Sequence, residues 1–161
     1  MIGRLRTWVG LSCTFVGEIE FAFSSAIVVW LLSGDPVEIE GDAKLLRRLI
    51  RNLLENAARH GRPPIRIAVT RRAGGARISV SDCGERIAPA ERERVFEPFY
   101  RPAGRSESAG GWGLSLSLVR QIARRHGGDV VCEAEPGGGS RFVVDLAENA
   151  ATTTHEVKPV R

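Results

Sequence analysis

Apolar residues recur at helical spacing over Ala43–Gly61 and predict an amphipathic helix there. Asp42 stands at the N-cap position, and Gly61, followed by Pro63 and Pro64, ends the pattern. We expect the rest of the chain to be organised around this helix. Its broad apolar face is formed by Leu45, Leu46, Leu49, Ile50, Leu53, Leu54 and Ala57.

Alternation of apolar and polar residues predicts two β-hairpins, each with one buried face. Pro36–Glu40 predicts a further short strand, and Ala90–Phe96 and Leu114–His126 predict two more helices. This order predicts an α+β fold, a two-layer α/β sandwich whose mixed, mostly antiparallel sheet is covered on one face by helices. The hairpin strands are Ile65–Arg71, Ala76–Asp82, Asp129–Glu135 and Ser140–Leu146.

The two ends of the chain differ from its middle, so we divide it into residues 1–34, 35–147 and 148–161. The first segment is apolar, but Glu18 and Glu20 interrupt it and the run Phe21–Leu32 is too short to span a bilayer. We expect it to supply a buried strand or helix that completes the core, with a membrane-proximal remnant as the alternative. Residues 148–161 have little apolar content and predict a flexible tail.

Composition is that of a soluble globular domain, with 161 residues, 43% hydrophobic and 26% charged. The net charge of +4 comes from arginines spread along the chain, so we expect no nucleic-acid partner. Cys13, Cys83 and Cys132 form no CxxC pair and indicate reduced thiols. We therefore expect a cytoplasmic chain without membrane association of its own.

Three stretches offer candidate chemistry. Asn52 and Asn56 lie one turn apart beside the apolar face, where an amide oxygen suits Mg²⁺ and an amide N–H suits phosphate. Asp82 ends a strand and can accept a hydrogen bond from an exocyclic amine, with Gly84 allowing close approach to the backbone. Gly110–Leu116 opens a helix and offers free N–H groups to a phosphate. Taken singly, these stretches are equally compatible with solvated asparagines, an ordinary turn and a flexible linker.

Together, in this order and spacing, the stretches resemble the ATP-binding catalytic domain of sensor histidine kinases. The resemblance covers about Pro36–Ala147 and implies the Bergerat fold. ATP and Mg²⁺ would then bind between the helix bearing the asparagines and a lid formed by about Ile87–Gly111. The matching stretches are Asn52–His60 (N box), Asp82–Ile87 (first glycine box), Phe96–Arg101 (F box), Gly111–Leu116 (second glycine box), Val119–Gly128 and Gly139–Phe142.

The resemblance assigns roles to individual residues. It implies that Asn56 is the Mg²⁺ ligand, that Asp82 reads the adenine amine and that Gly84 lies beside the ring. It also implies that Phe96 and Phe99 anchor the lid. The other ATP-binding positions that it implies are Asn52, Arg59, His60, Ile87, Tyr100, Arg101, Gly111, Gly113, Leu114 and Ser140.

The position four residues before the Mg²⁺ asparagine divides the family. ATP-hydrolysing members and anti-sigma-factor kinases carry a glutamate there, which acts as a general base. This chain has Asn52, which favours the histidine-kinase branch over an anti-sigma-factor-type serine kinase. No histidine lies in the context of the family's phosphoacceptor. The resemblance therefore implies a histidine-bearing dimerisation domain in trans as the partner and a response regulator as an indirect one. Parent kinases of this type are usually membrane-anchored.

Two positions depart from the family pattern. Arg86 replaces the second glycine of the first box, and Ser115 replaces the last glycine of the second box. If the backbone at position 86 needs φ > 0, arginine strains it and weakens ATP binding. We expect Arg86 to strain the turn or to enter the adenine site, with an outward orientation as the alternative. A degenerate, non-catalytic nucleotide- or protein-binding module therefore remains a second functional interpretation.

Overall fold

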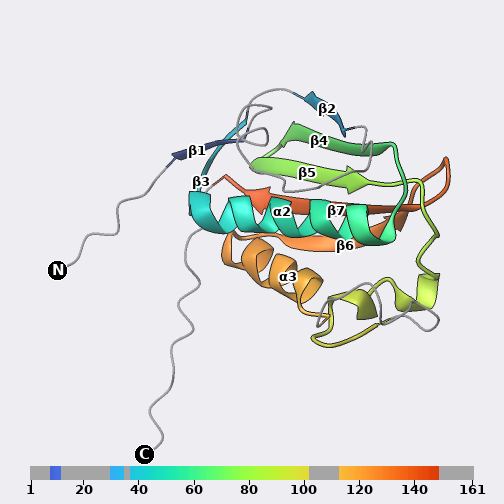
Figure 1. Cartoon of the computed structure of the whole chain (residues 1–161). Helices are drawn as coiled ribbons and strands as arrows, with labels where there is room; N and C mark the ends of the chain where they lie inside the picture. Colours follow the sequence, from blue (N-terminus) through green and yellow to red (C-terminus); the bar gives the residue numbers. More distant parts are fainter. Residues whose placement is uncertain (1–7, 12–29, 35–36, 102–112, 149–161) are drawn as a thin grey trace, which may run out of the picture.

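The computed structural model describes residues 8–11, 30–34, 37–101 and 113–148 (Figure 1). Its main sheet has five strands in the order β2-β4-β5-β7-β6. β2 pairs in parallel with β4, and the other neighbours pair antiparallel, so the sheet is mixed and mostly antiparallel, as the sequence predicts. Its strands are β2 (Trp30–Gly34), β4 (Ile65–Arg72), β5 (Gly75–Ser81), β6 (Asp129–Ala134) and β7 (Ser140–Ala147).

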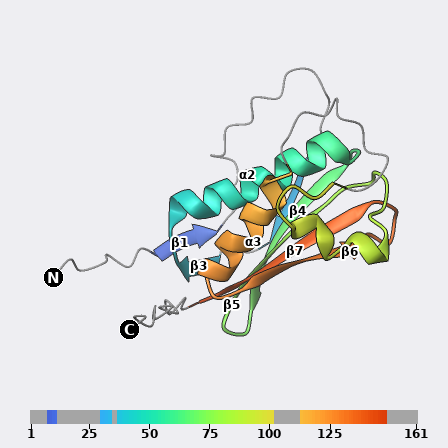
Figure 2. The same ribbon diagram turned by 90° about the horizontal axis from the view of Figure 1, so that it is seen from below.

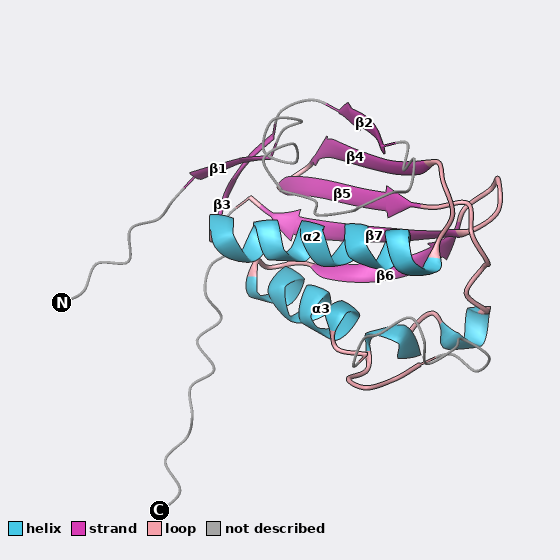
Figure 3. Cartoon of the chain, in the orientation of Figure 1, coloured by secondary structure: helices cyan, strands magenta, loops and turns pink. Residues whose placement is uncertain are grey.

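Helices α2 (Ala43–His60) and α3 (Ser115–Arg125) lie side by side on the same face of this sheet (Figures 1 and 2). Colouring by secondary structure shows the resulting two layers (Figure 3). The core lies between the layers, where the apolar face of α2 meets the apolar positions of the strands. The predicted two-layer sandwich is confirmed. The sheet contributes Ile65, Ile67, Val69, Ile78, Val80, Val130, Phe142, Val144 and Leu146 to this core.

The ends of α2 follow the predicted signals. The Asp42 side chain accepts hydrogen bonds from the N–H groups of Lys44 and Leu45 at 2.9 and 3.1 Å, which satisfies two free donors of the first turn. At the other end, Gly61 N–H donates to the Ala57 carbonyl at 2.9 Å. Because both ends are fixed, the face that carries the asparagines has a defined orientation over the sheet.

The connection from β5 to α3 differs from the prediction. The prediction of one helix at Ala90–Phe96 is wrong. This stretch forms two separate 3₁₀ turns, η1 (Pro89–Glu91) and η2 (Arg94–Phe96). Each turn closes with i→i+3 hydrogen bonds such as Glu97 N–H to the Arg94 carbonyl at 2.9 Å. A seven-residue segment is too short to stabilise an α-helix by itself. Burial of Val95 and Phe96 decides its conformation instead.

The first 34 residues contribute strands to the described structure. β1 (Trp8–Leu11) pairs antiparallel with β3 (Val37–Glu40) in a separate two-stranded sheet, and β2 extends the main sheet. The expected strand near Pro36–Glu40 is thus confirmed as β3. Within the described ranges, no helix has the length and apolar character needed to cross a bilayer.

The C-terminal prediction rests almost wholly on residues outside the described ones, because residues 149–161 are not described. Glu148, the first residue of the predicted tail, is held by backbone hydrogen bonds. Its N–H donates to the Gly74 carbonyl at 2.7 Å, and its carbonyl accepts from the N–H of Glu40 at 3.2 Å. These bonds connect the end of β7 to the β4–β5 turn and to β3.

Candidate functional site

Asp82 follows β5 directly, and its side chain is almost fully buried at 4% exposure. One carboxylate oxygen, Oδ1, accepts a hydrogen bond from Gly84 N–H at 2.7 Å. Gly84 in turn lies against the end of α2, since a Cβ on it would come within 2.8 Å of Gly61 Cα. The absence of a side chain at position 84 therefore lets the Asp82 turn pack onto the helix that carries the asparagines.

The turn between β6 and β7 holds Asp82 from the other side. Asp82 N–H donates to the Ser140 carbonyl at 3.0 Å, and Ile87 N–H donates to the buried Ser140 Oγ at 3.2 Å. Gly139 has φ of +84°, and a Cβ there would lie 2.0 Å from the Asp82 carbonyl oxygen. Only glycine fits this contact. The backbone that carries the carboxylate is therefore fixed by a segment far away in the sequence.

Gly139 is a site-supporting residue whose contact with Asp82 the sequence reasoning did not anticipate. The available signal is the run Gly137–Gly139 between two strands. Such a run predicts a turn but does not reveal which backbone the turn approaches.

Asn52 and Asn56 lie on one face of α2, both half-buried. The Asn52 amide nitrogen donates to the Ser115 carbonyl at 3.4 Å, so this face of α2 meets the first residue of α3. Arg59 and His60 follow in the last, exposed turn of α2. The structure therefore brings the N-box residues and the start of α3 together, and Gly61 brings them next to Asp82.

The F-box residues line the connection that leads toward α3. Phe96 is buried at 4% exposure and packs edge-to-face on Phe142, with ring centroids 6.1 Å apart. Tyr100 donates its hydroxyl hydrogen to Glu91 at 3.1 Å, and the Arg94 guanidinium lies 4.3 Å above its ring. Partial burial and this hydrogen bond raise the pKa of Tyr100. Phe96 therefore packs the connection onto the sheet, and its role in anchoring a lid over ATP stays a prediction.

The Phe99 ring lies at the surface of the described structure, and its expected role in anchoring the lid stays a prediction. The side chain is 69% exposed. Its backbone is held in place, because Phe99 N–H donates to the Gly113 carbonyl at 3.0 Å. Phe99 has φ of +65° and Gly113 has φ of +67°, and a Cβ on Gly113 would lie 3.0 Å from Phe99 Cα. The backbones of these two residues, both in the left-handed region, therefore pack closely against each other, and a side chain at position 113 would prevent this contact.

The remaining predicted ATP-binding positions lie just before α3, at the end of the described connection, or outside the described residues. Leu114 precedes α3 and is 42% exposed, while its carbonyl accepts hydrogen bonds from Leu118 N–H at 3.1 Å and Ser117 Oγ at 2.9 Å. Arg101 is exposed at the end of the described connection. Gly111 lies outside the described residues.

Arg86 takes the outward orientation. Its guanidinium Nη2 donates to the Glu135 carbonyl at 3.3 Å, at the end of β6. Among the described non-glycine residues, Phe99 is the one with positive φ, so Arg86 does not occupy the left-handed region. The expectation of a strained turn is therefore wrong, and the effect of Arg86 on the adenine site stays a prediction. Arginine is tolerated here because the β6–β7 turn provides an acceptor for its side chain.

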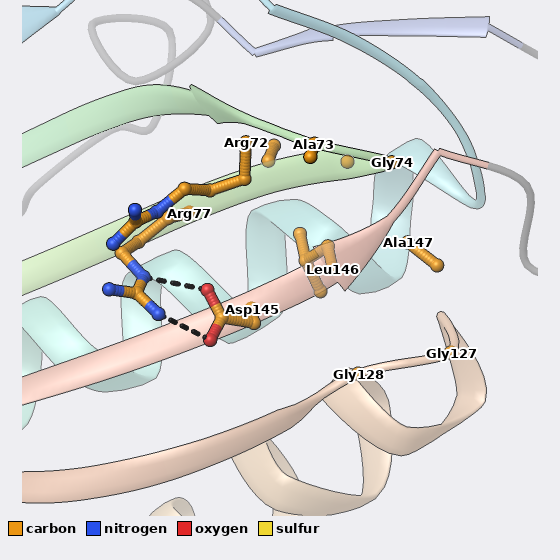
Figure 4. Close-up of a pocket in the computed structure, with 11 residues that line it drawn as sticks. Arg72, Ala73, Gly74, Arg77, Gly127, Gly128, Asp145, Leu146 and Ala147 are labelled. Carbon is orange, nitrogen blue, oxygen red and sulfur yellow. Dashed lines mark hydrogen bonds and ion pairs between the residues drawn. The ribbon is translucent and has the colours of Figure 1, made fainter.

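A cavity of 320 Å³ lies at the opposite end of β5 and β7 from Asp82 (Figure 4). Its walls include Arg72, the β4–β5 turn and the bidentate ion pair in which Arg77 contacts both Asp145 oxygens at 2.7 Å. The hydrogen bond from Arg77 lowers the pKa of Asp145 and outweighs the opposing effect of burial. Among the described residues, none of the site residues expected from the sequence lines this cavity.

The sequence of this chain is similar to those of known ATP-binding kinases and ATPases. A family model described as "Histidine kinase-, DNA gyrase B-, and HSP90-like ATPase" matches residues 41–150. The sensor protein IrlS of Burkholderia pseudomallei is 42% identical over 118 residues, covering 71% of this chain and 25% of IrlS. The sensor-like histidine kinase SenX3 of Mycobacterium tuberculosis is 38% identical over 144 residues, covering 80% of this chain and 35% of SenX3. The chain thus spans a quarter to about a third of these relatives.

Solved structures agree as well. The ATP binding domain of PrrB from Mycobacterium tuberculosis superposes with a TM-score of 0.70 at 25% identity, covering 89% of this chain and 98% of that domain. The catalytic domain of the histidine kinase ThkA superposes with a TM-score of 0.74 at 23% identity, covering 90% and 98%. At the latter identity the similarity concerns the fold alone.

Proposed function

The chain belongs to the family of histidine kinase-, DNA gyrase B- and HSP90-like ATPases, and from this we propose that it binds Mg-ATP and donates the γ-phosphoryl group to a histidine on a separate domain or chain. Within the family it is an ATP-binding catalytic domain of the sensor histidine kinase type, a Bergerat fold. The names of the sequence relatives favour this function over an anti-sigma-factor-type serine kinase and over a non-catalytic binding module.

The observation that carries the proposal is the buried Asp82 carboxylate. It lies at a strand end, where Asp82 N–H donates to the Ser140 carbonyl and the carboxylate itself accepts a hydrogen bond from Gly84 N–H. A buried carboxylate held in this way is suited to accept a hydrogen bond from the adenine amine. At the position equivalent to the adenine amine, guanine carries a carbonyl oxygen, which cannot donate a hydrogen bond to this carboxylate. Asp82 therefore supports selection of ATP over GTP.

The phosphate end of the nucleotide is assigned to α2 and to the start of α3. Asn56 offers a half-buried amide oxygen, a hard ligand that fits Mg²⁺, and Asn52 offers amide hydrogens close to Ser115. Arg59 and His60 supply positive charge and N–H donors in the next turn. When bound, Mg²⁺ would neutralise phosphate charge. These residues would hold and orient the triphosphate at the N-terminal end of α3, where free backbone N–H groups favour an anion.

The identity of residue 52 sets the type of transfer. An asparagine cannot take a proton from water or from a serine hydroxyl, so the site provides no general base at this position. A neutral histidine needs none, because its ring nitrogen already carries a lone pair for attack on phosphorus. The γ-phosphoryl group would pass to that nitrogen as ADP leaves. The proposed partner is accordingly a histidine-bearing dimerisation domain, with a response regulator downstream and a cytoplasmic location.

A two-part experiment tests this function. Isothermal calorimetry of the chain with Mg-ATP, Mg-GTP and ATP in EDTA measures the nucleotide site. We expect micromolar to millimolar binding of Mg-ATP, weaker binding of the other two, and acid-labile phosphate on an added histidine-bearing domain. Absence of Mg-ATP binding would leave only the non-catalytic module. Acid-stable phosphate on a serine of the added protein would indicate the serine-kinase alternative.

A further inference from the structure

Arg120, in the middle of α3, contacts two other parts of the chain, the start of β6 and the β5–α3 connection, although the family pattern assigned it no role. Its side chain is 19% exposed. The guanidinium binds Asp129 through Nε at 3.1 Å and Nη2 at 3.4 Å, and it binds Glu93 through Nη1. It also lies 5.3 Å from the centre of the Phe96 ring. One arginine therefore joins α3, the start of β6 and the connection that carries the F box.

We propose that Arg120 is a positioning residue of the ATP site, which holds the Glu93–Phe96 segment at a fixed distance from the start of α3. The proposal rests on the proposed function, because it assigns the F-box segment and the start of α3 to the two sides of one nucleotide site. The short turns between β5 and α3 lie beside the N-terminal part of that helix (Figure 1). Arg120 is placed to fix them there.

The two carboxylates that Arg120 binds differ in what they connect. Asp129 begins β6 and also binds Arg124 at 3.2 Å, so this pair secures α3 to the sheet. Burial would raise the pKa of Asp129, but the Val130 N–H and the two arginines lower it overall. Glu93 is 72% exposed, and its contact with Arg120 connects the F-box segment directly to α3. The planar guanidinium fork serves both carboxylates at once, which an ammonium group does not.

The position of this contact relates it to the site. Asn52 reaches Ser115 at the first turn of α3, and Phe99 reaches Gly113 just before it. Arg120 lies on the same helix, five residues beyond Ser115. If the F-box segment moves relative to α3, the side of the site bearing Phe96 and Tyr100 moves relative to the side bearing Asn52 and Ser115. An exposed ion pair adds little to folding stability, so its main effect is expected on nucleotide affinity.

Two matched substitutions separate positioning from general stabilisation. Glu93→Gln and Asp129→Asn each remove one charge from Arg120 with almost no change in size. Thermal unfolding without nucleotide gives Tm, and calorimetry with Mg-ATP gives Kd. We expect Glu93→Gln to weaken Mg-ATP binding about threefold to tenfold with little change in Tm. We expect Asp129→Asn to lower Tm more while leaving Kd within about twofold of the parent.

The double variant supplies the decisive control. In an Arg120→Gln background, Glu93→Gln should have no further effect on Kd, because its partner is already absent. If Arg120→Gln does not fold, Arg120→Met is the background, since methionine keeps an unbranched side chain but carries no charge to pair with Glu93. Equal effects of the two carboxylate variants on Kd, or a Glu93→Gln effect that persists without Arg120, would overturn the proposal. A parent chain that binds no Mg-ATP would instead contradict the proposed function.

Discussion

The His126 imidazole connects the C-terminal end of α3 to the N-terminal end of α2. Its Nε2 accepts a hydrogen bond from Asp42 N–H at 3.0 Å, which places the ring proton on Nδ1, 2.8 Å from the Ile122 carbonyl that accepts it. The ring is 3% exposed. It lies against Gly41, where a Cβ would come within 2.7 Å of the His126 Cδ2 atom. The two helices of the candidate site are thus held together at the ends remote from it.

Replacing His126 by alanine should therefore reduce stability without altering the nucleotide site. The variant loses buried contacts and leaves Asp42 N–H and the Ile122 carbonyl without these partners, a cost of about 2–4 kcal/mol. Urea denaturation measures the free energy of unfolding. The exposed neighbour variant Arg125→Ala should stay within about 0.5 kcal/mol of the parent. An unchanged free energy of unfolding in His126→Ala would contradict the connecting role of the ring.

Asn56→Ala should abolish Mg²⁺-dependent ATP binding and leave the fold intact. The substitution removes the proposed hard oxygen ligand from a half-buried helix position, where alanine is a good helix former. Calorimetry with Mg-ATP and with ATP in EDTA separates the metal contribution from the rest. Arg48→Ala, on the exposed face of the same helix, serves as the control. If Asn56→Ala bound Mg-ATP as tightly as the parent, the assignment of the Mg²⁺ ligand would be wrong.

Asp82→Asn should reduce the preference for ATP over GTP. The amide offers one acceptor oxygen and two donor hydrogens in place of a carboxylate, so the adenine amine loses a charged acceptor. A poorly matched buried polar group costs about 1–3 kcal/mol, or about 5- to 150-fold in affinity. Competition of the two nucleotides against a fluorescent ATP analogue measures the ratio. Equal affinity of the parent for ATP and GTP would exclude Asp82 as the reader of the base.

The elements that the sequence predicted correctly are those with local signals. The period of apolar residues in α2 and its Asp42 cap are encoded within a single segment, and the alternation in β4 and β5 is encoded in a hairpin. The prediction of a helix at Ala90–Phe96 failed because its pattern is short and its conformation depends on a non-local contact. Phe96 packs against Phe142, which lies far along the chain. Likewise, no local pattern specifies that β2 joins β4 in parallel.

The site residues required a different kind of inference. Neither Asn56 nor Asp82 is distinguishable from an ordinary surface or turn residue by spacing alone, and the ordered set of motifs linked them. The contacts that support them involve residues distant in the sequence, such as Gly139 against Asp82 and Arg120 against Glu93. A glycine or an arginine carries no mark of its partner, so these contacts emerge only when the chain is folded.

The Arg77–Asp145 ion pair predicts a small dependence of stability on pH. The pKa of Asp145 lies below its usual value of 3.8 in the folded chain, chiefly through the hydrogen bond from Arg77. A lowered folded pKa stabilises the fold above the unfolded pKa, and this contribution is lost as pH falls through the folded pKa. Because the Asp145 side chain is 52% exposed, solvent limits the contribution of this ion pair to the free energy of unfolding to at most about 1 kcal/mol. Urea denaturation of the parent and Asp145→Asn should differ at pH 7 and converge toward pH 3. If the difference in the free energy of unfolding between the two proteins stayed constant with pH, the pH-dependent contribution of the ion pair would be contradicted.

Arg86→Gly should leave Mg-ATP affinity within about twofold of the parent, because the arginine is exposed, does not strain the backbone and donates to the Glu135 carbonyl. Its side chain donates to the Glu135 carbonyl, and the Glu135 carboxylate binds Arg141 at 2.8 Å. The single exposed hydrogen bond lost in the variant contributes about 0.5–1.5 kcal/mol at most, and glycine adds freedom to the unfolded chain. We therefore expect a slight loss of stability in urea denaturation and an unchanged Kd in calorimetry. Arg86→Lys is the matched control, since it keeps the charge and the chain length. A severalfold tightening of Mg-ATP binding in Arg86→Gly, absent from Arg86→Lys, would show that the arginine obstructs the nucleotide site after all.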